Sequence, residues 1–284
     1  MEIRLRPGGW GDARTEEVET VLNAVALVML EHFPGRRLDP IVVTHTSSNP
    51  VTLFRRDANN QYQMFLTADG RQWARYAYEF AHELSHILTD FQHIDPAVAS
   101  YNQWFAEALC EVASLYALKR LAFEWEVAPP YPHWGAYAPQ FQRYAERMLT
   151  EEHRRLPADT TLARWFEKNQ SRLRASPYRR DYNEVVANLL LPLFEENPEI
   201  WEAIAFLNVH DDGGSFQGYL QSWYDNAPDD YRDIIRYVMA WFGVLRDTPE
   251  SLIASPPPAA PNQHGIDPDP RDASRSGVAG STSP

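Results

Sequence analysis

The spacing of apolar residues changes from a mixed pattern to a helical one near residue 72. Before that point, residues 15–33 have the period of a helix, with acidic residues in its first turn. Short segments with strand character follow at residues 41–44, 51–55 and 61–67. The run Asp-Ala-Asn-Asn at 57–60 separates the last two segments and indicates a hairpin. We therefore expect a small antiparallel sheet beside a helix.

From residue 72 onward the apolar positions keep a helical period. Trp73, Phe80 and Leu84 belong to one apolar stripe. A second helix follows a loop, and the sequence Ser100-Tyr-Asn-Gln103 predicts a capping box at its start. Further helices are expected at residues 138–152, 162–174, 182–195, 198–207, 216–224 and 228–245. The predicted fold class is α+β, a small antiparallel sheet plus a mostly helical body.

The composition of the chain changes after Thr248. Residues 249–284 are rich in Pro, Ser, Ala and Gly and contain no aromatic residue, so they cannot bury enough apolar surface to fold. The preceding part supplies an ample core, since the whole chain is 44% hydrophobic. We expect one folded domain over residues 1–248, followed by a disordered tail.

Charge and cysteine content narrow the class of protein. The formal net charge of -13 repels phosphate backbones, which argues against a nucleic-acid partner. The apolar run at 21–30 is short and lies between two glutamates, which suits a core helix and not a membrane span. Cys110 is the single cysteine, so no intramolecular disulfide can form, which fits a reducing compartment. We expect a cytoplasmic protein that binds neither nucleic acid nor membrane.

The segment with the clearest chemistry is His82-Glu83-Leu84-Ser85-His86, which falls within a predicted helix. Because residues four apart share a helix face, the two imidazoles can bind one cation. The pattern His-Glu-x-x-His is the zincin motif, in which the glutamate, here Glu83, acts as general base. The apolar stripe lies on another face of the helix, which leaves the two histidines free to line a cleft.

A third zinc ligand is expected from the next helix, which carries Glu107 and Glu111 four residues apart. With this spacing, the chain resembles the gluzincins, the thermolysin-like clan of zinc peptidases, over roughly residues 60–120. The resemblance implies that His82, His86 and Glu107 bind Zn²⁺. It also implies that Glu111 orients His82, although the clan usually has Asp at this position.

The resemblance makes further predictions for substrate binding. In gluzincins, the strand before the motif helix is an edge strand that pairs with extended peptide, and residues 61–67 are in that place. A Tyr or His usually stabilises the oxyanion of the tetrahedral intermediate. The candidates for that role are His93, Tyr137, Tyr178, Tyr182 and His210. Tyr182 is the favoured one, because it opens a predicted helix beside Arg179 and Arg180, which can hold a substrate carboxylate.

Three positions near the motif are not expected to take part in the chemistry. Ala106 stands where thermolysin-like enzymes often have Asn, so His86 lacks an assigned partner. Glu79 shares the face of His82 one turn earlier and is expected to be a solvated carboxylate. Cys110 is expected to be a small buried residue and not a metal ligand.

The predicted function is a zinc-dependent hydrolase and, from the resemblance, a peptidase with peptide or protein substrates. Water attacks a carbonyl while Glu83 takes its proton and later passes it to the leaving amine. The alternative is a regulatory or protein-interaction module that keeps the zinc site but has little or no proteolytic activity.

Overall fold

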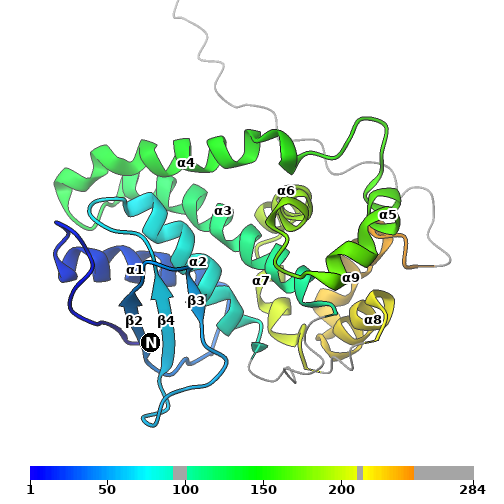
Figure 1. Ribbon diagram of the computed structural model, residues 1–284, viewed down its shortest axis with the longest axis horizontal. Helices are drawn as coiled ribbons and strands as arrows, with labels where there is room; N and C mark the ends of the chain where they lie inside the picture. Colours follow the sequence, from blue (N-terminus) through cyan, green and yellow to red (C-terminus); the bar gives the residue numbers. More distant parts are fainter. Residues whose placement is uncertain (92–100, 210–213, 246–284) are drawn as a thin grey trace, which may run out of the picture. The chain divides into compact units, whose positions relative to one another are not determined.

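The computed structural model describes residues 1–91, 101–209 and 214–245 (Figure 1). The tail expected at 249–284 and the candidates His93 and His210 lie outside these residues, as does Ser100 of the expected capping box. The described part of the chain is mostly helical, with a four-stranded sheet formed by N-terminal segments. The predicted combination of a small sheet and a helical body is therefore confirmed.

The four strands of the sheet are short. They are β1 (Ile3–Leu5), β2 (Ile41–His45), β3 (Val51–Thr52) and β4 (Tyr62–Leu66), in the order β1-β2-β4-β3. β3 and β4 pair as the predicted hairpin. The prediction that the sheet is antiparallel was wrong, because β2 runs parallel to both β1 and β4. A connection lies between the strands of each parallel pair, and it gives the chain room to return in the same direction.

The core of the N-terminal part lies between the sheet and two helices. α1 (Thr15–Leu30) packs against α2 (Trp73–Leu88) and contacts β1. Tyr62, Met64 and Leu66 are buried along β4, while the residues between them are half-buried. This alternation follows from the two-residue period of a strand with one face on the core.

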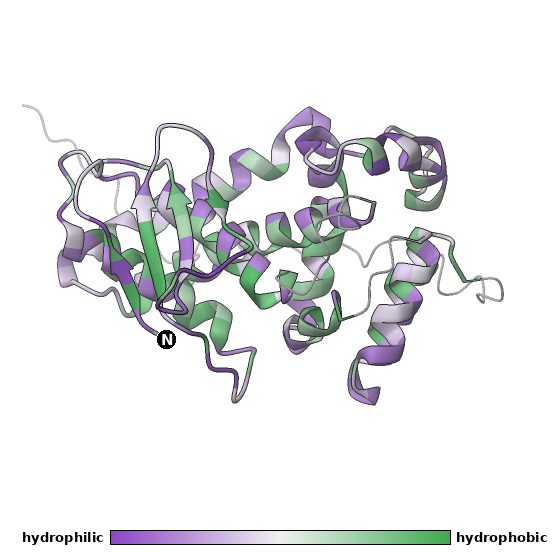
Figure 2. Cartoon of the chain, turned by 60° about the horizontal axis from the view of Figure 1, so that its bottom comes forward, coloured by the Kyte–Doolittle hydropathy of each residue, from purple (hydrophilic) through white to green (hydrophobic). Residues whose placement is uncertain are grey.

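α3 (Gln103–Val127) is the central helix of the remaining chain. It packs against α2, α4 (Ala138–Thr150) and α6 (Arg180–Glu196). The other helices are α5 (Leu162–Ala175), α7 (Ile200–Ala203), α8 (Phe216–Asn226) and α9 (Asp229–Trp241), with 3-10 turns η2 (Pro132–Tyr137), η3 (Glu152–Arg154) and η4 (Ile204–Phe206). Figure 2 shows hydrophobic residues concentrated on the strands and the central helices, and mixed faces on the outer helices.

Most of the predicted helices have counterparts with bounds that differ by a few residues. The segment 198–207 is the exception, because it divides into α7 and η4. The predicted capping box was also wrong, since the N-cap of α3 is Asn102 and Gln103 is its first residue. Within the described ranges, no helix is both long and apolar enough to cross a membrane.

An aromatic cluster fixes the N-terminal end of α3. The fully buried Phe105 packs against Phe216 and Trp223 of α8 and against Phe242, with ring centroids 5.3, 6.0 and 5.8 Å away. Aromatic pairs at such distances stabilise a core beyond the area that they bury. Because Glu107 follows Phe105 by two residues, the cluster also sets the position of that carboxylate.

Replacing Phe105 with Ala removes the central ring of this cluster. We expect the free energy of unfolding to fall by about 3–5 kcal/mol, as for other truncations of buried phenylalanine. Phe123→Ala is the matched control, because Phe123 lies on the same helix and is 59% exposed. Its effect should stay within about 0.5 kcal/mol. Guanidinium unfolding followed by circular dichroism measures both variants, and equal losses would contradict the aromatic anchor.

Candidate metal centre

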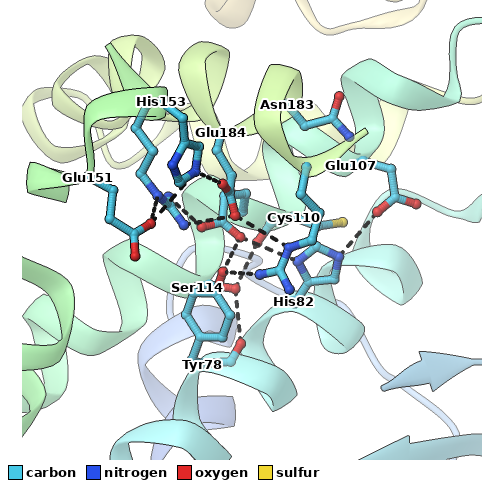
Figure 3. A network of polar contacts seen from close by, with 12 residues as sticks. Tyr78, His82, Glu107, Cys110, Ser114, Glu151, His153, Asn183 and Glu184 are labelled. Atoms are coloured by element: carbon cyan, nitrogen blue, oxygen red, sulfur yellow. Dashed lines mark hydrogen bonds and ion pairs between the residues drawn. The ribbon is translucent and has the colours of Figure 1, made fainter. Parts of the chain in front are cut away.

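The two helices that pack most closely, α2 and α3, carry the predicted metal ligands on their facing sides. His82 Nε2 lies 3.3 Å from one oxygen of Glu107, and His86 Nε2 lies 3.6 Å from the other. The two imidazole rings are 5.2 Å apart and nearly perpendicular. Figure 3 shows His82 on α2 turned toward Glu107 on α3. The structure thus brings together all three residues that the sequence predicts as ligands.

The apolar stripe of α2 explains why the histidines face the cleft. Tyr76, Phe80 and Leu84 are fully buried on the core side of the helix. His82 and His86 lie on a different face, where their side chains keep 23% and 14% of their surface exposed. The helical period therefore separates the residues that pack from those that can bind a ligand.

The spacing of the donor atoms fits a zinc ion. Zinc bonds of about 2.0–2.2 Å place the ligand atoms of a tetrahedron roughly 3.4 Å apart. His82 Nε2 and His86 Nε2 lie at about this distance, 3.3 and 3.6 Å, from the two different oxygens of the Glu107 carboxylate. Two imidazoles and one carboxylate also form a common ligand set of catalytic zinc.

A second set of three possible ligands overlaps with the first. His82, His86 and Cys110 each offer an atom within 4.8 Å of the others, and the thiol lies 3.4 Å from His86 Nδ1. Cys110 is fully buried and does not line the cleft, and burial raises the pKa of its thiol well above the usual range. Glu107 lines the cleft and Cys110 does not, so Glu107 is the better candidate for the third ligand of a metal that is open to a substrate.

The contact with Cys110 supplies the partner that the sequence left unassigned for His86. When Nε2 faces a metal, Nδ1 carries the proton of the imidazole and donates it to a neighbouring acceptor. For His86 that acceptor is the sulfur of Cys110. Cys110 is buried, as predicted, but it also contacts the candidate ligand His86.

Glu111 lies behind His82, where the resemblance to gluzincins places it. Its Oε2 atom is 3.9 Å from His82 Nδ1, an ion-pair distance that exceeds a hydrogen bond. Tyr78 donates a hydrogen bond to Oε2 at 2.6 Å, and Arg154 donates one to Oε1 at 2.8 Å. The carboxylate is therefore held in place by one donor on each of its oxygens, and Oε2 is also the oxygen that faces His82.

The electrostatics of the site favours a positive charge between the ligands. Burial lowers the pKa of His82, but the carboxylates of Glu107, Glu83 and Glu111 together outweigh burial and raise that pKa to about 9. Burial alone would raise the pKa of Glu107, yet the two imidazoles outweigh it, and the pKa lies below the ordinary value. Burial raises the pKa of Glu83 above its ordinary value, although both imidazoles oppose this effect.

His82, Glu83 and Glu107 line a cleft of about 650 Å³, a size typical of ligand-binding sites. One wall is the loop at residues 48–50, and the other contains Tyr178, Arg180 and Asn183 at the start of α6. A smaller pocket of about 140 Å³ shares His82, Glu83, Glu107 and Tyr178 with the cleft and has more apolar walls. His82, Glu83 and Glu107 thus line both the cleft and the smaller pocket.

The structure does not bring Tyr182 to this cleft. Its hydroxyl accepts a hydrogen bond from Arg172 at 3.1 Å, and its ring packs against Trp165 of α5. α6 begins at Arg180, before the predicted start, and the face that holds Tyr182 is turned toward α5. The hydroxyl of Tyr137 is also occupied elsewhere, because it accepts the backbone N–H of Ala74.

Among the candidates that the structure describes, Tyr178 is the one that lines the cleft. It is 63% exposed, and its hydroxyl accepts a hydrogen bond from Gln103 at 3.0 Å. The same amide of Gln103 contacts Glu107 at 3.4 Å, so Tyr178 lies next to the candidate ligands. Its position just before a helix gave no reason in the sequence to prefer it to Tyr182.

Two other predictions for the cleft were wrong. β4 is not an edge strand, because β3 covers its outer side, and Val51 and Thr52 of β3 line the smaller pocket. Glu79 is not solvated, since it is buried and accepts the backbone N–H groups of Thr67 and Ala68. These bonds attach α2 to the end of β4 and fix one side of the cleft.

Comparisons with known proteins add no family assignment. A scan against protein-family models finds no match, and a search among curated proteins finds no relative. The assignment of a function therefore depends on the geometry of the site.

The choice between Glu107 and Cys110 can be tested by measuring zinc affinity in competition with a chelator. We expect Glu107→Gln to weaken zinc binding by more than about 100-fold, beyond the usual effect of losing an outer partner of a ligand. Cys110→Ala should retain a zinc ion. Glu126→Gln, an exposed carboxylate on the same helix, is the control and should leave the affinity unchanged. Tight binding by Glu107→Gln together with loss in Cys110→Ala would reverse the assignment.

Proposed function

We propose that the protein is a zinc-dependent hydrolase that cleaves peptide bonds and resembles the gluzincins. The observation that carries this proposal is the position of Glu83 beside His82, His86 and Glu107: all four line the smaller pocket, and all but His86 also line the larger cleft. Three ligands and a neighbouring carboxylate are the groups that a catalytic zinc site requires. The class of substrate comes from the resemblance and from the shape of the cleft.

His82, His86 and Glu107 would hold the zinc ion. The ion would supply Lewis acidity, which lowers the pKa of a water molecule to about 7 and polarises a substrate carbonyl. Glu111 and Cys110 keep the two imidazoles in place from behind, at 3.9 and 3.4 Å from their Nδ1 atoms. Such partners fix the orientation of a ligand and raise its basicity.

Glu83 acts as the general base in this proposal. Its carboxylate is buried beside the ligands, and the pKa raised by burial makes it a better proton acceptor than an exposed glutamate. It takes the proton of the attacking water and passes it to the leaving amine. Thr52 donates a hydrogen bond to the backbone carbonyl of Glu83 at 3.1 Å and so anchors this turn of α2 to β3.

The remaining cleft residues suit an extended peptide. β3 is an edge strand of the sheet, and its exposed Val51 lines the smaller pocket, so a substrate backbone can pair with it by β-augmentation. Tyr178 lies across the cleft and can donate a hydrogen bond to the oxyanion. β3 and Tyr178 thus take the roles that the sequence assigned to residues 61–67 and Tyr182.

Replacing Glu83 with Gln separates the hydrolase from the alternative of a zinc-binding regulatory or interaction module. We expect cleavage of a denatured protein or a peptide library to fall by about 10²–10⁴-fold, because the general base is lost. The zinc content should not change, since Glu83 is not a ligand. Glu126→Gln serves again as the control. Equal cleavage by the wild type and zinc-loaded Glu83→Gln, or none by either, would support the alternative.

Replacing Tyr178 with Phe tests the oxyanion contact. We expect kcat to fall by about 10²–10³-fold, the usual effect of removing one donor to an oxyanion, while KM stays nearly constant. Tyr182→Phe is the matched control, because it removes a hydroxyl outside the cleft. If Tyr182→Phe lowers kcat and Tyr178→Phe does not, the role belongs to Tyr182, as the sequence suggested.

A further inference from the structure

Arg154 in η3 is an arginine whose side chain is completely buried. Moving a charged group from water into a protein interior costs several kcal/mol unless it is paired and hydrogen-bonded. No role for this residue follows from its sequence, Glu-Glu-His-Arg-Arg, which resembles an exposed polar segment. A buried guanidinium in such a segment needs a reason in the surrounding structure.

The partners of Arg154 are three carboxylates. Its Nη1 atom donates to Glu111 at 2.8 Å, its Nη2 atom lies 2.9 Å from Glu184, and its Nε atom donates to Glu151 at 3.1 Å. The side chains of Glu111 and Glu184 are only 3% and 7% exposed. Figure 3 shows this network beside the candidate metal centre.

The contacts around Glu111 close into a ring. Tyr78 donates to Glu111 at 2.6 Å and accepts a hydrogen bond from Arg180 at 2.9 Å. Arg180 lies 3.3 Å from Glu184, and Glu184 also contacts Arg154, which completes the ring. The ring joins α2, α3, η3 and α6, so each oxygen of Glu111 has a fixed donor.

The same group of side chains does not form a second metal site. Glu151, His153 and Glu184 lie close enough together to bind a cation. However, Arg154 contacts both carboxylates, and Arg180 also contacts Glu184. The positive charge that these carboxylates need is therefore already supplied by the protein.

Glu111 connects this ring of contacts to the candidate metal centre. Its Oε2 atom faces Nδ1 of His82, while Nε2 of the same imidazole faces Glu107. The gluzincins usually have Asp at this position, and the additional methylene of Glu111 lets the carboxylate reach Arg154 as well. Without the guanidinium, Oε1 would lose its partner in the interior, and the carboxylate would move toward water.

We propose that Arg154 is a positioning residue for the metal ligand His82 and acts through Glu111. This role depends on the metal centre proposed above and not on peptide hydrolysis. It predicts that replacing Arg154, which is 72 positions after His82 in the chain, changes the affinity for zinc and the spectrum of bound cobalt. Partners behind a ligand typically change metal affinity by about 10–100-fold when they are removed.

The test measures zinc affinity by chelator competition and the visible absorption spectrum of the Co²⁺-substituted protein. We expect Arg154→Met to weaken zinc binding by about 10–100-fold and to change the cobalt spectrum. Arg154→Lys keeps a cation and should restore part of the affinity. Arg155→Met, an exposed neighbour, is the control and should behave as the wild type.

A double-mutant cycle with Glu111→Gln tests the path of the effect. If Arg154 acts through Glu111, the change from Arg154 to Lys should weaken zinc binding in the wild type but add little in Glu111→Gln. This comparison also serves if Arg154→Met does not fold. Variants with lower stability but wild-type affinity and spectrum would overturn the positioning role alone. A wild-type protein that does not bind zinc would overturn the proposed function as well.

Discussion

The packing of α2 against α3 brings several ionisable side chains into the interior, and their burial constrains the surrounding structure. Glu83, Glu107 and Glu111 are at most 9% exposed, and the two histidines lie beside them. Each unpaired charge at such a place would cost several kcal/mol. The elements around the two helices are therefore arranged so that they provide partners. β3, η3 and α6 all contribute polar groups to this one interface.

The contacts of the buried carboxylates separate those that stabilise the structure from those that face the candidate metal centre. Glu79 is held by two backbone amides and an arginine, and Glu111 is held by an arginine and a tyrosine. Glu107 faces the imidazoles of both histidines. Within the described residues, Glu83 forms no ion pair, and it lines both the cleft and the smaller pocket. Glu83 is thus the carboxylate with the fewest stabilising contacts, and it is also the one that the motif assigns to proton transfer.

The sequence predicted local features well, because the helical period and the spacing of His82 and His86 depend on neighbouring positions along the chain, while Glu107 was expected from the resemblance to gluzincins. It failed where distant segments decide the outcome. The pattern of a short strand does not specify its partner, so the parallel pairing of β2 was missed. Arg154 lies in a polar segment, and only its contacts with two other helices make it a buried residue. The position of Tyr182 near a helix start does not specify which neighbour its ring meets, and its contacts with Arg172 and Trp165 of α5 hold it outside the cleft.

The two histidines of the candidate centre are held by chemically different partners. His82 has a carboxylate behind it, which is fixed by Arg154 and Tyr78, whereas His86 contacts a neutral thiol. An anion raises the basicity of an imidazole more than a neutral sulfur does, so His82 should be the stronger donor. The packing of α3 accounts for this difference, because Cys110 and Glu111 are adjacent on one helix and point to different histidines. A pair of histidines on a solvated helix would not require either partner, and the burial of both supports the proposed metal centre.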